Sequence, residues 1–216
     1  FTEQILRLPH SHLCYAPEAI RAMPEAGYEP PVRRNGYVTF GSFNNFAKVT
    51  DEVLLLWRGI LESVRGSKLI IKGKIASIDS GINFAKKRLS MLNYDLARVE
   101  FRPYSPDYLE QYRDIDIALD TAPYNGGLTT CEALYMGVPV ISLRGRTHGA
   151  RFAASILTNA GVRELIAEND INYVRRAVQL AETPKLLEAY HMGLRANMKR
   201  SPLMNVQGYM EELETA

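Results

Sequence analysis

Four residues whose types and spacing suit ligand binding stand between two short apolar segments: Gly126, Gly127, Thr129 and Thr130. Glycines allow backbone conformations closed to other residues and let a ligand approach the main chain closely. Threonine hydroxyls add donors to the unpaired N–H groups at a helix start, where the helix dipole favours an anion. This arrangement suits a phosphate-bearing ligand, and it is also compatible with an ordinary capped helix after a turn.

The flanking segments indicate how this loop is positioned. Residues 115–119 and 138–143 have the composition of buried strands, and a helix of about two turns between them makes a parallel crossover unit. Thr129 as N-cap places Glu132 at the third helical position, which is the spacing of a capping box. Asp120 ends the first strand, and we expect its carboxylate to pin the following loop through hydrogen bonds.

Lys48 is a second candidate, because it follows a predicted strand at 36–43 and stands just before a helix. Thr50 fits the N-cap of that helix, and a cation beside a helix N-terminus is unfavourable unless an anion neutralises it. Two alternatives remain open. The anion is either a ligand phosphate or one of the acidic residues of the first turn, Asp51 and Glu52.

The rest of the chain alternates strands and helices, which predicts an α/β fold with a doubly wound, Rossmann-like parallel sheet and extra C-terminal helices. Ligands bind such sheets outside the carboxyl ends of the strands. The absence of a G-x-G-x-x-G fingerprint from the first turn argues against a nicotinamide enzyme. Strands are predicted at 36–43, 68–72, 98–101, 115–119 and 138–143, helices at 51–64, 81–93, from Ser105 onward, at 150–160, 170–182, 185–198 and 205–214, and ligand loops at 44–48, 104–108, 124–130 and 144–149.

The composition is that of a globular chain with one good core: 216 residues, of which 46% are hydrophobic and 23% charged. A net charge of +2 gives no reason to expect nucleic acid as a partner. No apolar run approaches the length of a membrane span. Cys14 and Cys131 are too few for a disulfide framework, so we expect reduced thiols in a cytoplasmic protein, with Cys131 packed inside its helix.

The first 35 residues contain five prolines, and their hydrophobic residues show no sustained helical or strand periodicity. This composition indicates an extended connector between domains. His10 and His12 stand two apart in it, but no Cys, Asp or Glu partner is near, so we expect no metal site. His148, in a later loop, is a candidate proton acceptor with no orienting partner near it in sequence. The start at Phe1 instead of Met is typical of a piece of a longer protein.

Several separated motifs, in order, carry a family resemblance: FGSFNNFAK at 40–48, DIALDTAPYNGGLTTCEAL at 116–134, GVPV at 137–140 and RFAAS at 151–155. They resemble the carboxyl-terminal catalytic half of O-linked N-acetylglucosamine transferases, including the plant SPINDLY-type and bacterial homologues. These are inverting, metal-independent glycosyltransferases of GT-B type, with two facing nucleotide-fold lobes. The resemblance implies that 1–35 is the tail of a missing amino-terminal lobe, 36–200 the nucleotide-sugar-binding lobe and 201–216 a C-terminal helix.

The resemblance also implies roles for single residues. Lys48 is expected to pair with the diphosphate as the catalytic residue of this lobe, with Asn45 beside it. Glu132 takes the place of an acidic residue that binds ribose. Tyr108 stands where the family usually has a His stacked on the nucleoside, and a Tyr ring can also stack. The loop around Ser105 is expected to meet the uracil through its backbone. The expected nucleotide-sugar-binding set is Asn44, Asn45, Lys48, Ser105, Tyr108, Asn125, Gly126, Gly127, Thr129, Thr130 and Glu132.

Two positions depart from the family pattern. Animal members have a His where this chain has Gly127, and Leu128 replaces a Thr that is common in bacterial members. SPINDLY-type members use GDP-fucose as an alternative donor, so neither the base nor the sugar follows from the motifs.

The implied reaction moves a sugar, GlcNAc from UDP-GlcNAc in most of the family, to Ser or Thr of a protein without a cofactor. Lys48 and the helix at Thr129 would stabilise charge on the leaving diphosphate. The expected partners are a nucleotide sugar, a protein or peptide acceptor, and an amino-terminal lobe with helical repeats. The alternatives are a sugar-nucleotide epimerase lobe and a non-catalytic module that binds nucleotide or protein.

Overall fold

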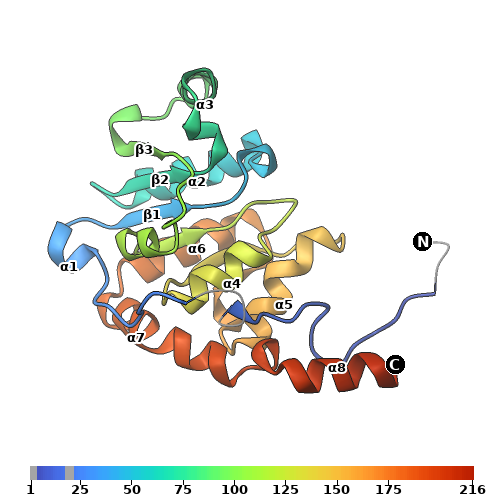
Figure 1. The fold of residues 1–216 in the computed structure, drawn as a ribbon. Helices are drawn as coiled ribbons and strands as arrows, with labels where there is room; N and C mark the ends of the chain where they lie inside the picture. Colours follow the sequence, from blue (N-terminus) through green and yellow to red (C-terminus); the bar gives the residue numbers. More distant parts are fainter. Residues whose placement is uncertain (1–3, 18–21) are drawn as a thin grey trace.

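A computed structural model describes residues 4–17 and 22–216. Its sheet has six strands in the order β3-β2-β1-β4-β5-β6, and all paired neighbours are parallel (Figure 1). This is the strand order of a doubly wound fold, so the predicted class is confirmed. The strands are β1 (Thr39–Ser42), β2 (Lys68–Lys72), β3 (Val99–Arg102), β4 (Ile117–Leu119), β5 (Val140–Leu143) and β6 (Ile166–Ala167).

Helices cover both faces of the sheet, because right-handed crossovers run in opposite directions from β1 and from β4. On one face α2 lies against α6, and on the other α4 packs against α5 and α7 (Figure 1). The helices are α1 (Val32–Asn35), α2 (Asp51–Ser63), α3 (Asp79–Met91), α4 (Leu128–Tyr135), α5 (Phe152–Asn159), α6 (Asp170–Ala181), α7 (Pro184–Arg200) and α8 (Val206–Thr215).

Helix α2 shows how local sequence and packing agree. Thr50 caps it as predicted, since its hydroxyl accepts a hydrogen bond from the Val53 N–H at 3.3 Å. Trp57, on its apolar face, is completely buried and donates from Nε1 to the Tyr173 hydroxyl of α6 at 3.1 Å. The apolar stripe of α2 therefore closes the core on this face of the sheet.

Two local predictions are wrong, and one strand was missed. The segment that begins at Ser105 forms turns and a short 3-10 helix, Glu110–Asp114, instead of an α-helix. The reason is tertiary, because the Ser105 hydroxyl is engaged by side chains and does not cap a helix. The connector before residue 36 contains α1, whose first N–H donates to the buried Asp116 carboxylate at 2.8 Å. Strand β6 was not predicted, since two residues are too short to show a period.

The order of the strands places a switch point between β1 and β4. The chain leaves β1 toward one edge of the sheet and leaves β4 toward the other, so the two following loops stand at the point where doubly wound folds form their ligand crevice. One loop carries Asn44 to Lys48 and the other carries Asp120 to Gly127. Two of the four predicted ligand loops thus lie next to each other.

The amino-terminal segment crosses in front of α4 and α5 and reaches α8 (Figure 1). The Tyr15 N–H donates to the Leu203 carbonyl at 2.7 Å, and the Tyr209 hydroxyl of α8 donates to the His12 carbonyl at 3.3 Å. The segment around His12 and Tyr15 is therefore packed against the C-terminal part of the chain. Among the residues that the structure describes, no helix has the length and apolar character needed to span a membrane.

Candidate functional site

Asp120 organises the loop that follows β4. Its carboxylate accepts hydrogen bonds from the N–H groups of Thr121 at 2.8 Å and Gly126 at 2.7 Å, and from the Ser142 hydroxyl at 2.6 Å. The predicted pinning of the loop is therefore confirmed. Burial raises the pKa of Asp120 to about 6, against the opposing effect of these three donors.

The two glycines of the loop differ in the space around them. A Cβ on Gly126 would lie 2.6 Å from the Thr129 hydroxyl and 2.7 Å from the Thr130 hydroxyl, so no side chain fits. At Gly127 the nearest atom to such a Cβ is a ring carbon of Phe152 at 3.9 Å, which is ordinary contact. Neither glycine has a positive φ, so neither adopts the left-handed backbone conformation that favours glycine. Close approach at Gly126 is the reason for glycine.

Helix α4 begins differently from the prediction. Its N-cap is Gly127, which carries no side-chain cap, so the capping box of Thr129 and Glu132 is wrong. The Thr129 hydroxyl instead donates to Asn44 Oδ1 at 3.0 Å, and the Thr130 hydroxyl donates to the Gly126 carbonyl at 3.0 Å. The threonines thus tie the start of α4 to the loop after β1 and to its own loop.

Lys48 lies at the junction of the two loops. Its Nζ donates to the Asn125 carbonyl at 3.2 Å and stands 4.3 Å from the centre of the Tyr124 ring. Burial lowers the pKa of Lys48, and the charge of Asp120 acts in the opposite direction. A half-buried ammonium at a helix start offers an anion both charge and N–H donors.

The acidic residues of α2 do not neutralise Lys48, so that alternative is wrong. The Asp51 carboxylate pairs with Arg88 Nε at 2.5 Å, across the groove between α2 and α3. The charged groups that act on Glu52 are Asp51 and Arg88. The carboxylate whose charge acts on Lys48 is Asp120, at the end of β4.

The loop after β3 is held by a lysine that sequence reasoning missed. Lys72 Nζ donates to the Pro103 carbonyl at 2.5 Å and to the Ser105 hydroxyl at 3.0 Å. Gln111 Nε2 donates to the same hydroxyl at 2.8 Å. Lys72 is only 3% exposed, and a lysine that ends an otherwise apolar, buried strand is the signal that could have identified it.

The loops after β3 and β4 meet through a hydrogen bond from the Tyr108 hydroxyl to the Glu132 carboxylate. Glu132 lies in α4 and is only 2% exposed, so this hydrogen bond is buried on the side of the carboxylate. The predicted nucleoside-binding and ribose-binding residues are therefore brought together.

The remaining predicted residues have mixed environments. Asn44 is buried and accepts from Thr129, whereas Asn45 is exposed and accepts from the Ala47 N–H at 3.1 Å. Asn125 is completely buried, and its amide donates to the carbonyls of Thr121 and Leu143 at 2.9 and 3.3 Å. Asn125 thus shapes the loop with its side chain and meets Lys48 with its backbone.

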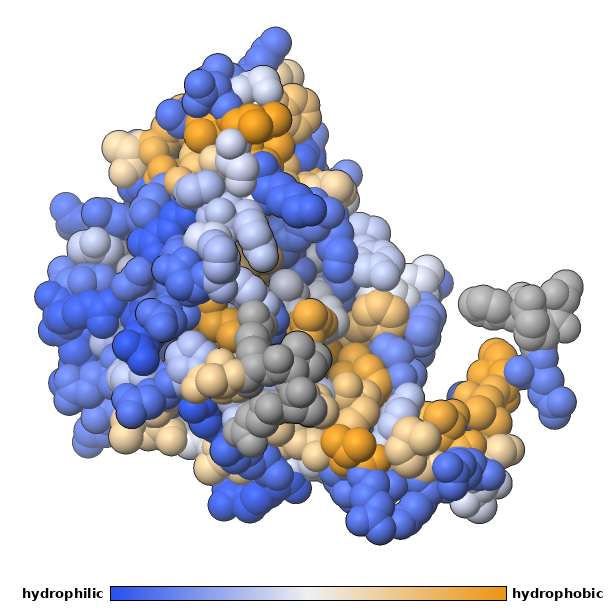
Figure 2. Space-filling view, in the orientation of Figure 1, coloured by the Kyte–Doolittle hydropathy of each residue, from blue (hydrophilic) through white to orange (hydrophobic). Residues whose placement is uncertain are grey.

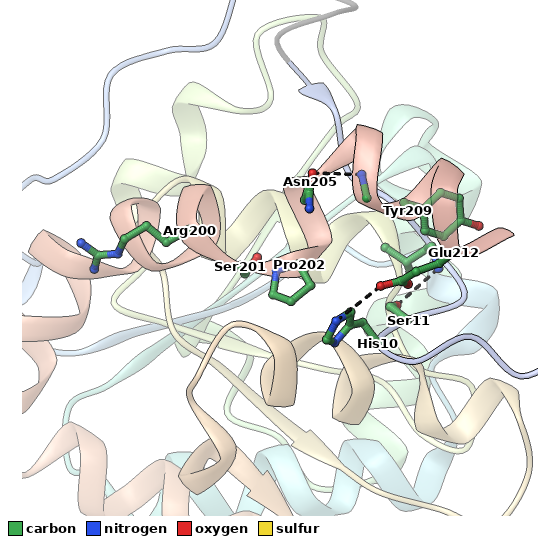
Figure 3. A pocket seen from close by; sticks show the side chains of 10 residues that line it. His10, Ser11, Arg200, Ser201, Pro202, Asn205, Tyr209 and Glu212 are labelled. Atoms are coloured by element: carbon green, nitrogen blue, oxygen red, sulfur yellow. Dashed lines mark hydrogen bonds and ion pairs between the residues drawn. The ribbon is translucent and has the colours of Figure 1, made fainter. Parts of the chain in front are cut away.

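The three histidines of the predicted connector and loops, His10, His12 and His148, lie in two places. The rings of His12 and His148 both contact Phe152, with centroid distances of 4.7 and 4.8 Å, and lie 5.1 Å from each other. His10 pairs with Glu212 of α8 at 3.4 Å, as Figure 3 shows. In the part of the chain that the structure describes, no three His, Cys, Asp or Glu side chains are grouped to hold a metal.

Figure 3 also shows the pocket around His10, which has a volume of about 180 Å³ and lies between the amino-terminal segment and α8. Its polar groups are used locally: Ser11 accepts from the Leu13 N–H, and Asn205 accepts from the Gly208 N–H. This pocket therefore lies between residues 10–13 and the C-terminal segment 200–212, and it is separate from the loops after β1 and β4.

A groove of about 770 Å³ adjoins Asn45 on the side of α3. Two exposed apolar side chains, Ile78 and Phe84, line it together with Arg88 and Lys74. Figure 2 shows apolar surface at the end of the molecule where Figure 1 places α3. The candidate site thus borders apolar surface on one side.

Solved structures place this architecture among the nucleotide-fold lobes of GT-B glycosyltransferases. The chain superposes on a Thermobaculum terrenum O-GlcNAc transferase mutant, K341M, with a TM-score of 0.83 and 28% identity, over 99% of this chain and 40% of that one. WaaG, a glycosyltransferase involved in lipopolysaccharide biosynthesis, shares the fold with a TM-score of 0.64 and 17% identity, over 97% of this chain and 56% of that one.

The chain belongs to glycosyl transferase family 41, whose model matches residues 22–213. It is 41% identical over 217 residues to a probable UDP-N-acetylglucosamine–peptide N-acetylglucosaminyltransferase SPINDLY of Eustoma exaltatum subsp. russellianum, and 40% identical over 219 residues to the SPINDLY of Arabidopsis thaliana. These matches cover 98% and 99% of this chain but 23% of each relative. The chain therefore spans about a quarter of the length of these relatives, and the predicted family is confirmed.

Proposed function

We propose that this chain is the nucleotide-sugar-binding lobe of an inverting, metal-independent protein O-glycosyltransferase. The observation that carries the proposal is the position of Lys48, whose ammonium is held against the Asn125 carbonyl beside the start of α4. The names of the relatives support UDP-GlcNAc as donor and a peptide as acceptor. Residues 1–35 would be the tail of a preceding lobe, 36–200 the binding lobe and 201–216 a terminal helix.

The diphosphate would lie between Lys48 and the N-terminus of α4, with the Gly126 backbone close to it. The ribose would lie toward Glu132 and the base toward Tyr108, since these two residues are joined by a hydrogen bond. This order follows the chain of base, ribose and diphosphate in a nucleotide.

In the reaction, the oxygen of a Ser or Thr hydroxyl would attack the anomeric carbon while the bond from that carbon to the diphosphate oxygen breaks. Lys48 and the dipole of α4 would stabilise the negative charge that grows on the leaving diphosphate. The hydroxyl proton would pass to a base outside this chain. Asp120 is engaged by three donors, and His148 packs on Phe152, so neither is free to orient an acceptor.

Calorimetry with UDP and UMP tests the phosphate assignment. Lys48→Met should weaken UDP binding by about 1.5–3 kcal/mol, the range for a hydrogen bond to a charged group, and UMP binding by less. Lys68→Met is the matched control, because Lys68 lies exposed at the other end of the sheet over the Tyr37 ring. Equal losses for UDP and UMP would refute the diphosphate contact.

The same titrations in EDTA test metal independence. UDP affinity that falls tenfold in EDTA and returns with Mg²⁺ would contradict it.

The lobe assignment has its own test. The chain should bind donor but leave a Ser/Thr-rich peptide unmodified, since positioning an acceptor supplies several kcal/mol of the barrier. Peptide glycosylation by the chain alone, lost in Lys48→Met, would show that one lobe suffices. Absence of both UDP and GDP binding would favour the non-catalytic alternative.

The proposed cytoplasmic location rests on the low number of cysteines, two in 216 residues. Cys131 is completely buried in α4, as predicted, and Cys14 is partly buried; both are free thiols. Burial raises the pKa of the Cys131 thiol to about 12, so it stays protonated and unreactive at neutral pH.

A further inference from the structure

Tyr104 is an exposed aromatic residue beside the proposed base-binding end of the crevice. Its side chain is 58% exposed, so burial in the fold does not explain an aromatic residue at this position. Its backbone is nevertheless held, because the Tyr104 N–H donates to the Ser77 hydroxyl at 3.2 Å. A fixed backbone that presents an exposed ring is typical of a stacking platform for a ligand.

The Tyr104 ring stands opposite a second ring, that of Tyr108. Their centroids are 6.3 Å apart, and their planes are inclined by 31°. A planar base stacked between two rings needs about 7 Å between them, twice the 3.4 Å separation of stacked bases. The two tilted rings are therefore close enough to flank one base, as the walls of a slot, provided that the exposed Tyr104 side chain rotates to face Tyr108.

The two walls of this slot differ in freedom. The hydroxyl of Tyr108 donates to the buried Glu132 carboxylate, which fixes that ring relative to α4. Tyr104 lies between Pro103 and Ser105, and the buried ammonium of Lys72 holds both of these neighbours. One wall is thus fixed by its ring and the other only by its backbone, so the second can adjust to the base that enters.

We propose that Tyr104 is a nucleobase-binding residue, which stacks on the face of the base opposite to Tyr108. The inference rests on the proposed function, because it requires a nucleotide in the crevice. The ligand class is a nucleoside diphosphate recognised through the π-face of its base. Stacking is tolerant of base identity, and a purine covers more of two facing rings than a pyrimidine does.

The experiment measures binding of three probes, UDP, GDP and inorganic pyrophosphate, by calorimetry to the unmodified chain and to Tyr104→Ala. Removing a base–aromatic stack should weaken UDP and GDP binding by about tenfold, with the larger loss for GDP, and leave pyrophosphate binding unchanged. Tyr104→Trp should retain the affinity for both nucleotides. Tyr37→Ala is the matched control, since Tyr37 lies at the opposite end of the sheet beside Lys68.

Separate outcomes overturn the inference and the proposed function. If the unmodified chain binds UDP or GDP and Tyr104→Ala binds it equally well, Tyr104 does not contact the base, and the proposed function stands. If Tyr104→Ala weakens pyrophosphate as much as the nucleotides, its effect comes from the fold of the loop and the stacking proposal is wrong. If the unmodified chain binds none of the three probes, both proposals fall.

Discussion

The loop after β4 and the loop after β3 follow strands of the same sheet edge, but they are held in different ways. A buried carboxylate, Asp120, holds the first through backbone donors, and Gly126 leaves no room for a side chain. Two side chains, the buried Lys72 and the half-buried Gln111, hold the second through the hydroxyl of Ser105. A loop closed by buried main-chain hydrogen bonds suits the proposed diphosphate contact, which is the same in every nucleotide, whereas a loop held by side chains suits the proposed contact with a variable base.

The largest expected effect is that of Asp120→Ala. It leaves the Gly126 and Thr121 N–H groups buried without their acceptor, and each such group costs about 1–3 kcal/mol. The free energy of unfolding should fall by about 3 kcal/mol in urea titrations, and UDP binding should be lost. Asp107→Ala, in the exposed loop after β3, is the control and should leave the urea midpoint unchanged. Equal loss of stability in both variants would remove the distinction between the loops.

The two neighbouring glycines provide a matched pair. Gly126→Ala forces a methyl group to within 3 Å of two threonine hydroxyls, and overpacking of this kind costs about 1–3 kcal/mol. UDP binding should weaken together with the melting temperature. Gly127→Ala, at a φ of −106° and with no atom closer than 3.9 Å, should leave both unchanged. If Gly127→Ala proves the more damaging, the space around Gly126 is not what keeps it a glycine.

The carboxylates of the two loops should also differ in their pH dependence. Burial raises the pKa of Asp120 from 3.8 to about 6, whereas a hydrogen bond from Ser105 lowers the pKa of Asp107. Between pH 3.8 and 6 the folded chain holds a proton on Asp120 that the unfolded chain releases, so the Asp120 contribution to stability rises as pH falls.

The unmodified chain should therefore gain on the order of 1 kcal/mol in unfolding free energy relative to Asp120→Asn between pH 7 and pH 5. Buried groups elsewhere, such as Asp116 and His191, are present in both proteins and cancel in this difference. Asp107→Asn should show no such gain. A flat difference for Asp120→Asn over this range would mean that its carboxylate ionises as it does in the unfolded chain.

The smallest effect is expected for the lysine of the loop after β3. Lys72→Met keeps the stem of the side chain but removes the donors to Pro103 and Ser105, so the loop should loosen and UDP affinity should fall a few-fold. Pyrophosphate affinity should stay unchanged, because the loop after β4 is untouched. Lys68→Met, at the exposed start of the same strand, should change neither. A larger loss than in Lys48→Met would place the diphosphate nearer to Lys72.

The sequence by itself determined most of the elements and their order. Helix α2 has its Thr50 cap and an apolar stripe at helical spacing, and β2 is a continuous apolar run between lysines, so both follow from local pattern. The alternation of such elements is enough to predict a doubly wound sheet, and a parallel sheet brings the following loops to one edge. Lys48, Thr129 and Asp120 were identified for the same reason, because each follows a strand or opens a helix.

Only the tertiary structure decided how those loops are closed. The hydrogen bonds from Lys72 to Ser105, from Tyr108 to Glu132 and from Ser142 to Asp120 join residues that are more than twenty positions apart. They compete with local preferences: the Ser105 hydroxyl is taken by a lysine instead of capping a helix, and the Thr129 hydroxyl is used by Asn44. A polar side chain has few donors and acceptors, so a partner that folding brings close can displace the local one that the sequence suggests.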